Sequence, residues 1–307
     1  MVTYIGRRVV QAIPVLLGIS VFTFLMLHLV PGDPVTAIAG DKPLTDERIA
    51  QIRHQYGLDR PLWVQYGDYV GGVLRGDLGS GLHSQRPVAD SIREALWPTV
   101  QLTLAGVAVA MVLGVALGIL AAIFHNTWLD TGAMAVALVG VSMPVFYLGL
   151  LLLFAFSFNF HLFPATGLGG WRHLVLPAIA VGFTSSAYIA RLVRSSMLDV
   201  LRQDYVVTAR AKGLVEGLVV TRHALKNALI PTVTYLGLQL AGLLSGAVVT
   251  ETVFSRPGLG RVAVTAISNR DYPLIQGTVL VTAGIYVLVN LLVDLLYGAI
   301  DPRIHYD

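Results

Sequence analysis

The stretch ALWPTVQLTLAGVAVAMVLGVALGILAAIFHNTWL, residues Ala95–Leu129, contains no Asp, Glu, Lys or Arg. A helix that crosses the hydrocarbon core of a bilayer needs about 20 mostly apolar residues, so this stretch is long enough to span a membrane. Apolar and polar residues do not alternate along it, as they would in a strand of a membrane barrel. We therefore expect a transmembrane α-helix, which satisfies its backbone polar groups internally.

Five further runs lack charged residues: Val9–Gly32, Thr131–Trp171, His173–Ala190, Asn227–Thr250 and Tyr272–Val293. Glycine and polar residues crowd the second half of Thr131–Trp171, so we expect one span there, about Met134–Phe156, followed by a loop. The chain has 55% hydrophobic and only 13% charged residues, against about 25% charged in soluble domains. An all-α integral membrane protein with six transmembrane helices is predicted.

The placement of Lys and Arg predicts the orientation of these spans. With the N-terminus inside, the inner segments carry ten basic residues and the short outer loops carry four, as the positive-inside rule requires. Both termini are therefore expected in the cytoplasm. The alternative for the first run is a secretory signal peptide with a cleavage pattern at Ala37-Ile38-Ala39, but the run exceeds the usual apolar region of about 7–15 residues.

Three segments follow from these spans: residues 1–30 with the first span, an external helical loop domain at 31–94, and a core domain at 95–307 that contains spans two to six. In the loop, Thr45 is expected to start a helix that Gly57 ends. Pro61 and Pro87 suit the first turns of two more helices. The loop is either a cap packed on the membrane face or a docking surface for an external partner, because aromatic anchors serve both uses.

The inner segment 195–229 is far longer than the roughly 2–8 residues that a simple helix connection needs. It reads as a helix, then Gly213, then a second helix, which indicates a cytoplasmic docking element. The alternative is an amphipathic helix on the anionic inner leaflet. Acidic residues, among them Asp204 and Glu216, interrupt the basic ones and weaken that reading.

Several kinds of chemistry are excluded by residues that the sequence lacks. There is no Gly-Lys pair and therefore no P-loop, no His-Glu pair for a zinc protease motif, and no cysteine. Ser245 in the fifth span has no histidine base within a span, which argues against an intramembrane protease. Asp294 lies near a helix end, so a proton-coupled carrier lacks its usual mid-membrane acid. A net charge of +3 does not indicate nucleic-acid binding. We expect no enzymatic activity, cofactor or metal site in the chain itself.

Isolated polar residues and a proline within the spans are candidates for a pathway or gate: Pro144, Gln239, Ser245, Thr250 and Glu251. Such residues often only kink helices or form hydrogen bonds between them. The pairs Gly114/Gly118 and Gly242/Gly246 have the spacing of close helix contacts, within the chain or with another subunit.

The inner segment carries a resemblance to a known family. DYVVTARAKGL (Asp204–Leu214) followed by HALKNALIP (His223–Pro231) resembles the EAA loop of ABC-importer permeases, and more narrowly the dipeptide/oligopeptide/nickel permease family. Further motifs fit that family in order along the chain: VPGDP (Val30–Pro34), YGLDRP (Tyr56–Pro61), GDLG (Gly76–Gly79), PATG (Pro164–Gly167), ETVF (Glu251–Phe254), PGLG (Pro257–Gly260) and DPR (Asp301–Arg303). The chain is most similar to the first of the family's two permease subunits, which has the long loop after span one.

The resemblance implies the type I ABC-importer architecture in a bacterial or archaeal plasma (inner) membrane. It implies four partners besides membrane lipid: a second homologous permease, two ABC ATPases that use ATP and Mg²⁺, and an external substrate-binding protein. The substrate would be a dipeptide or oligopeptide, with nickel import as the alternative within the family. A self-sufficient, ATP-independent secondary carrier is the alternative from another class.

The resemblance also implies that the turn at Gly213 inserts into a groove on the ATPase. The implied coupling residues are Asp204, Tyr205, Ala209, Arg210, Ala211, Lys212 and Gly213. Ala209 and Ala211 would allow close approach, and Arg210 and Lys212 would pair with acidic groups of the ATPase. The family's glutamate position holds Val207 here, so we expect Asp204, on the same helix face, to substitute for it.

Overall fold

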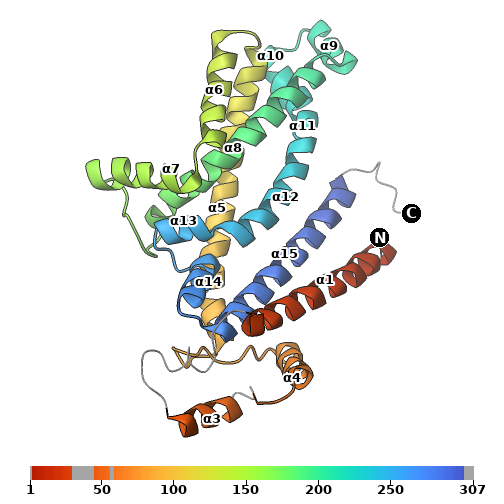
Figure 1. Cartoon of the computed structure of the whole chain (residues 1–307). Helices are drawn as coiled ribbons and strands as arrows, with labels where there is room; N and C mark the ends of the chain where they lie inside the picture. Colours follow the sequence, from red (N-terminus) through yellow and green to blue (C-terminus); the bar gives the residue numbers. More distant parts are fainter. Residues whose placement is uncertain (1, 30–44, 56–58, 301–307) are drawn as a thin grey trace. The chain divides into compact units, whose positions relative to one another are not determined.

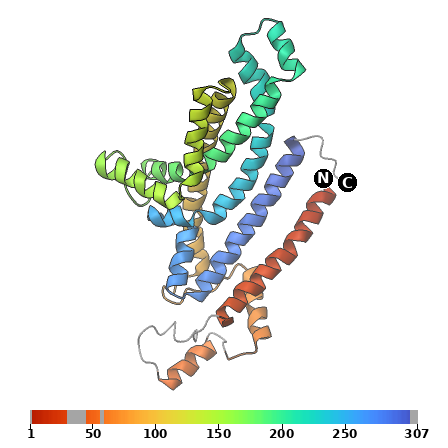
Figure 2. The same cartoon turned by 45° about the horizontal axis from the view of Figure 1, so that its top comes forward.

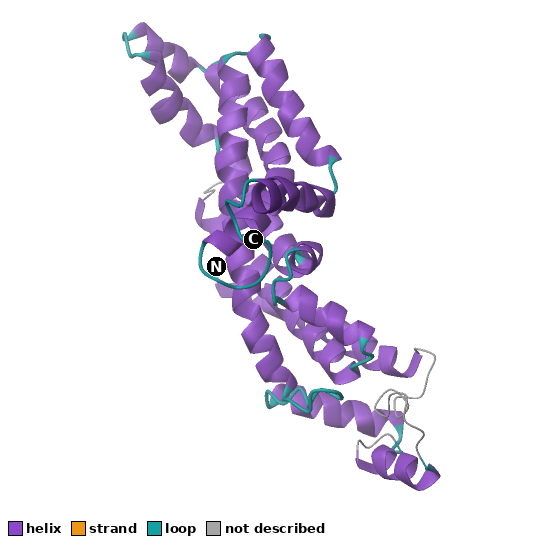
Figure 3. Ribbon diagram, turned by 90° about the vertical axis from the view of Figure 1, so that its left-hand side faces the viewer, coloured by secondary structure: helices purple, strands orange, loops and turns teal. Residues whose placement is uncertain are grey.

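The computed structural model describes residues 2–29, 45–55 and 59–300 (Figure 1). These residues are helical or in loops, and Figure 3 shows no strand among them. The α-helices, in chain order, are α1 (Val2–Leu29), α3 (Asp46–Gln55), α4 (Leu62–Leu74), α5 (Val88–Ile123), α6 (Trp128–Ser142), α7 (Val145–Leu152), α8 (Arg172–Leu201), α9 (Asp204–Ala211), α10 (Glu216–Leu218), α11 (Leu225–Ala228), α12 (Ile230–Gly246), α13 (Val248–Val253), α14 (Leu259–Ser268) and α15 (Tyr272–Ile300). Two π-helical segments, η1 (Leu153–Asn159) and η2 (Val219–Ala224), join them.

Four of these helices are long and apolar enough to cross a membrane: α1, α5, α8 and α15. A fifth span results if α6 and the continuous helix α7–η1 are counted together, although they are bent by 106° at their junction. The bend lies at Pro144, where Met143 is extended, because proline disfavours a helical conformation in the residue before it. The prediction of an integral membrane helical protein is confirmed. The count of six spans and the cytoplasmic position of both termini stay predictions.

The three helix starts predicted from Thr45, Pro61 and Pro87 are confirmed. Helix α3 begins directly after Thr45, α4 directly after Pro61, and α5 directly after Pro87. Helix α5 then continues without interruption into its own membrane-spanning part. The predicted border between residues 94 and 95 therefore falls inside one helix, and Gly57 lies outside the described residues.

The described chain forms two compact units, residues 1–98 with 257–307 and residues 99–256, which differ from the three predicted segments. In the first unit, α1 lies beside α15 (Figure 2), and Gln276 of α15 donates a hydrogen bond of 3.3 Å to the carbonyl of Thr23. Helix α4 packs on α1, where the Tyr66 hydroxyl lies 2.9 Å from the Ser20 hydroxyl. Helix α4 is thus anchored to α1; the choice between a cap and a docking surface stays a prediction.

In the second unit, α8 is the central helix and packs against α5, α6, α7 and α12. A Cβ atom added at Gly114 would lie 2.6 Å from Ile189, and one at Gly118 would lie 2.7 Å from Val193. The predicted close approach at these two glycines is confirmed as a contact within the chain, between α5 and α8. No heavy atom of the described structure lies within 4 Å of a Cβ added at Gly242.

Candidate coupling loop and pathway residues

The predicted docking element is a short helix followed by a sharp turn. Helix α8 continues through Arg191 and Arg194 to Leu201, so residue 195 lies within it, and the exposed loop begins at α9. Helix α9 ends at Ala211, and Gly213 has φ +80°, a left-handed conformation that glycine adopts without steric cost. The second helical part is irregular and consists of α10, η2 and α11. The helix–Gly213–helix pattern is therefore present.

An ion pair closes this turn. Arg210 donates from Nε to Glu216 at 3.0 Å and from Nη2 to the other carboxylate oxygen at 2.6 Å. These bonds raise the pKa of Arg210 and lower the pKa of Glu216. The Arg210 guanidinium, which was expected to meet an acid of a partner, is thus paired within the chain. Sequence reasoning did not assign Glu216 a role; its spacing of six residues from Arg210 across a glycine turn was the available signal.

The small residues of α9 face two directions. Ala209 is only 6% exposed and packs with Val206 and Val219 in a cluster that closes the inside of the loop. Ala211 is exposed. The structure therefore places Ala209 in the loop's own core, because it lies one helical turn after the buried Val206.

The outer side of the loop presents an apolar and charged surface, which we call the coupling face: Asp204, Val207, Lys212 and Val215. Val207 is 53% and Val215 is 72% exposed, and Asp204 and Lys212 are also exposed. Asp204 and Val207 are three residues apart on one helix and share this side. Beside the face, Tyr205 is held in place by a 2.7 Å hydrogen bond that its hydroxyl accepts from Asn227.

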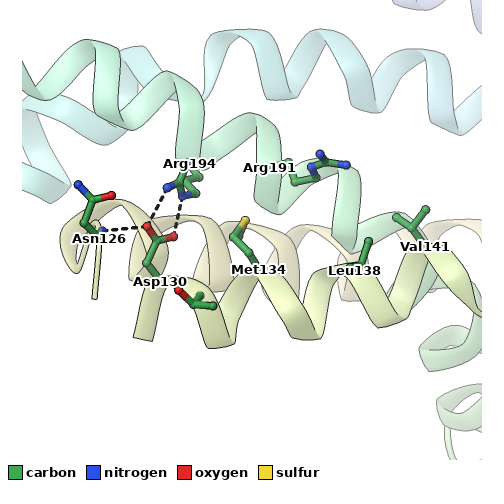
Figure 4. A pocket seen from close by; sticks show the side chains of 8 residues that line it. Asn126, Asp130, Met134, Leu138, Val141, Arg191 and Arg194 are labelled. Carbon is green, nitrogen blue, oxygen red and sulfur yellow. Dashed lines mark hydrogen bonds and ion pairs between the residues drawn. The ribbon is translucent and has the colours of Figure 1, made fainter. Parts of the chain in front are cut away.

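A second polar cluster, which sequence reasoning missed, ties α6 to α8. Arg194 donates from Nε and Nη2 to the two oxygens of Asp130, both at 2.7 Å (Figure 4). The backbone N–H of Asn126 donates to the same carboxylate at 3.0 Å. The Asp130 side chain is 7% and the Arg194 side chain 27% exposed. Two parallel charge-assisted bonds fix both distance and orientation between the helices.

The predicted pathway residues fall in three places. Pro144 directly precedes α7 at the bend. Gln239 of α12 donates a 2.5 Å hydrogen bond to the Tyr235 hydroxyl, and the ring of Tyr235 lies 6.1 Å from the ring of Tyr188 on α8. Tyr188 is half-exposed. Ser245 lies in α12, and its side chain is outside the described part of the structure.

The remaining two pathway candidates are buried inside the second unit. Glu251 is fully buried and accepts a 2.6 Å hydrogen bond from the Thr99 hydroxyl. Thr250 is also buried. Nearby, the buried Arg256 donates to Gln101 at 3.1 Å. These two hydrogen bonds join the part of α5 in this unit to α13 and to the residues just after it. Glu251 therefore helps to hold these helices together.

These features define a helical membrane protein with an exposed loop between α8 and α12 that turns at Gly213, and comparisons with known proteins give its family. Residues 114–306 match the family described as "Binding-protein-dependent transport system inner membrane component". Residues 1–103 match the N-terminal component of the same kind of system. The chain belongs to this family of ABC-importer permeases, and it is a multi-pass protein of the inner membrane that works with an ATPase and a substrate-binding protein.

Similar proteins cover the whole chain. The glutathione transport system permease protein GsiC of Salmonella choleraesuis is 45% identical, and the alignment covers 100% of both chains. The dipeptide transport system permease protein DppB of Alkalihalophilus pseudofirmus is 44% identical with the same full coverage.

Solved structures share the fold at lower identity. The methionine ABC transporter MetNI in an inward-facing form matches with a TM-score of 0.56 and 20% identity, over 68% of this chain and 96% of that chain. An amino acid ABC transporter matches with a TM-score of 0.51 and 17% identity, over 70% and 94%. The expected type I permease architecture is confirmed.

Proposed function

We propose that this chain is one permease subunit of an ATP-driven importer of short peptides. Together with a second, homologous permease it forms the translocation pathway, and its coupling face binds one of two ABC ATPases. ATP and Mg²⁺ are bound and used by those ATPases, so this chain supplies no catalytic group. An external binding protein delivers the substrate.

The observation that carries the proposal is the coupling face, which runs from the first residue of α9 to just beyond the Gly213 turn. Exposed valines on a polar cytoplasmic segment cost free energy in water, and a protein partner that covers them recovers it. Asp204 and Lys212 add one charge of each sign at the rim, which favours a specific orientation of the partner. The Gly213 turn keeps the protruding end narrow.

The packing of the second unit provides a route for force from this loop to the spans. Val220, Ala224 and Ala228 behind the coupling face pack in one buried cluster with Ile189 and Val193 of α8. Helix α8 is in turn tied to α6 by the Arg194–Asp130 pair and to α5 at Gly114 and Gly118. Tightly packed helices move as rigid bodies, so a pull on the loop would rotate α5, α6 and α8 together.

The peptide substrate is proposed from the relatives. Permeases named for glutathione and for dipeptides are 44–45% identical over the whole chain, and no nickel permease is needed to account for the resemblance. Glutathione is itself a tripeptide, so both names describe short peptides. Within the pathway we propose Tyr235 and Gln239 of α12 as lining residues, since an aromatic ring beside an amide offers both stacking and hydrogen bonds to a peptide backbone.

Coupling is tested in proteoliposomes that contain the two permeases, the ATPases and the binding protein. Gly213→Val forces a β-branched residue into a left-handed conformation, and Asp204→Ala removes the acidic rim of the coupling face. Both variants are expected to lower ATP-dependent uptake and substrate-stimulated ATP hydrolysis at least tenfold, with normal membrane insertion. The matched controls are Gly71→Val on the external helix α4, where a Cβ meets no atom within 4 Å, and Asp199→Ala on exposed α8 surface.

Uptake of a labelled dipeptide, of glutathione and of Ni²⁺ is compared in the same system. Uptake of either peptide with no Ni²⁺ uptake is the expected result. Uptake of Ni²⁺ alone would contradict the proposal of a peptide substrate. Peptide uptake without ATP would support a secondary carrier instead.

A further inference from the structure

A groove that the coupling mechanism does not use runs along α6 and α8 in the second unit. Its volume is about 710 Å³. It is lined by Asn126, Asp130, Thr131, Met134, Leu138, Val141, Arg191 and Arg194 (Figure 4). One end of the groove is polar and the rest is apolar.

The polar end carries one uncompensated positive charge. Asp130 and Arg194 neutralise each other through their two 2.7 Å bonds. Arg191 lies one turn before Arg194 on α8. It is exposed, and it makes no ion pair with any residue that the structure describes. A guanidinium with five free donors at the mouth of a groove is suited to the oxygens of a phosphate group.

The apolar part of the groove is a strip on one face of α6. Met134, Leu138 and Val141 follow each other at spacings of four and three residues, so they line one side of the helix over a length of about 10 Å. Leu138 is 60% exposed. The small residues of the same helix, Ala133 and Ala137, are buried. The face of α6 that allows close helix packing is therefore already used. Of the larger side chains in the strip, Met134 is half-buried beside the Ala137 cluster, and Leu138 and Val141 are exposed.

The position of the groove relative to the bilayer follows from the orientation of α8. The proposed function places the segment beyond α8 in the cytoplasm, and on that basis the Arg194–Asp130 pair lies toward the inner leaflet and Arg191 lies about 4.5 Å farther along the helix toward the membrane. An arginine at this depth extends its charged end to the headgroup layer while its stem contacts apolar groups. The inner leaflet is rich in anionic lipids that attract such cations.

We propose that this groove binds one anionic phospholipid, with its phosphate on Arg191 and an acyl chain along Met134, Leu138 and Val141. An anionic phospholipid carries one negative phosphate group and two acyl chains. The phosphate matches the one free cation, and one of the two chains matches the apolar strip beside it. The proposal rests on the inward orientation of the α8 end and is independent of the substrate. A bound lipid would fill the space beside the Arg194–Asp130 pair and support the packing of α6 on α8.

The test uses the complete transporter in nanodiscs. A photocrosslinking amino acid replaces Leu138, and crosslinking to phosphatidylglycerol is compared with crosslinking to phosphatidylcholine. One cation near the membrane surface contributes about 1 kcal/mol to binding an anionic lipid, which corresponds to roughly a fivefold preference. Arg191→Gln is expected to remove this preference, and Arg191→Lys is expected to keep most of it. Arg202→Gln, at an exposed arginine just beyond α8, is expected to leave it unchanged.

Three results would overturn the proposal. The first is a crosslink from position 138 to a protein subunit instead of lipid. The second is an unchanged phosphatidylglycerol preference in Arg191→Gln, or an equal loss in Arg202→Gln. The third is displacement of the lipid by inorganic phosphate, which would show a site for a free anion. All three readouts measure lipid contact, so a failure of the peptide-import proposal would not affect them.

Discussion

Replacing Asp130 by alanine should separate α6 from α8 and weaken the whole second unit. The change removes two 2.7 Å bonds from Arg194 and one 3.0 Å bond from the Asn126 N–H. Breaking a buried ion pair by deleting one partner costs about 3–5 kcal/mol, because the other charge stays buried without compensation. The Arg194 side chain keeps 27% exposure and regains some hydration, so we expect the lower end, about 3 kcal/mol.

The unfolding midpoint of the purified complex in nanodiscs measures this loss. At about 2–4 °C for each kcal/mol in a unit of this size, Asp130→Ala should lower the midpoint by about 6–12 °C. The control Asp199→Ala removes an exposed carboxylate from α8 and should shift it by less than about 2 °C. The double variant Asp130→Ala/Arg194→Ala should be more stable than Asp130→Ala alone, because no charge is left unpaired.

The reasoning would be refuted if Asp130→Ala unfolded at the temperature of the Asp199→Ala control. It would also be refuted if removing Arg194 as well deepened the loss. Either result would mean that the ion pair does not hold the two helices together. The same variant carries a second expectation: the freed Arg194 adds a cation to the groove, so the phosphatidylglycerol preference should rise.

Two further predictions concern the packing of α5 and the coupling turn. Gly118→Val should destabilise the second unit by about 1–3 kcal/mol, because its side chain would overlap Val193, whereas Gly132→Val on open surface of α6 should cost much less; equal midpoints for both variants would contradict the α5–α8 contact. The Glu216 carboxyl has a lowered pKa because Arg210 donates two hydrogen bonds to it, so its stabilising effect is present above the ordinary glutamate pKa and is lost as the pH falls through the lowered value. The protection factor of the amides across the turn, which is the exchange rate divided into the rate of an unfolded peptide at the same pH, should therefore be steady from pH 8 to pH 6 and fall only in acid; for this exposed pair the effect is below about 1 kcal/mol, and Glu216→Gln should abolish the acid dependence.

Much of the architecture is readable from the sequence because it depends on local composition. Charge-free runs predict α1, α5, α8 and α15, since each run must satisfy its own backbone hydrogen bonds in lipid. Thr45, Pro61 and Pro87 mark helix starts for equally local reasons. Gly213 is predicted as a turn because a left-handed backbone conformation favours glycine wherever it occurs.

What the tertiary structure alone decides is which side chains meet. The Arg194–Asp130 pair joins residues 64 positions apart, and the Thr99–Glu251 bond joins residues 152 positions apart. These contacts depend on how each helix is rotated about its own axis, which the period of apolar residues leaves open when a helix is apolar on every side. The same rotation buries Ala209 and leaves Arg191 unpaired at a groove. The sequence by itself therefore determines a helical membrane protein with a long helical insertion that turns at Gly213, and packing decides which of its few charges hold helices together and which remain unpaired.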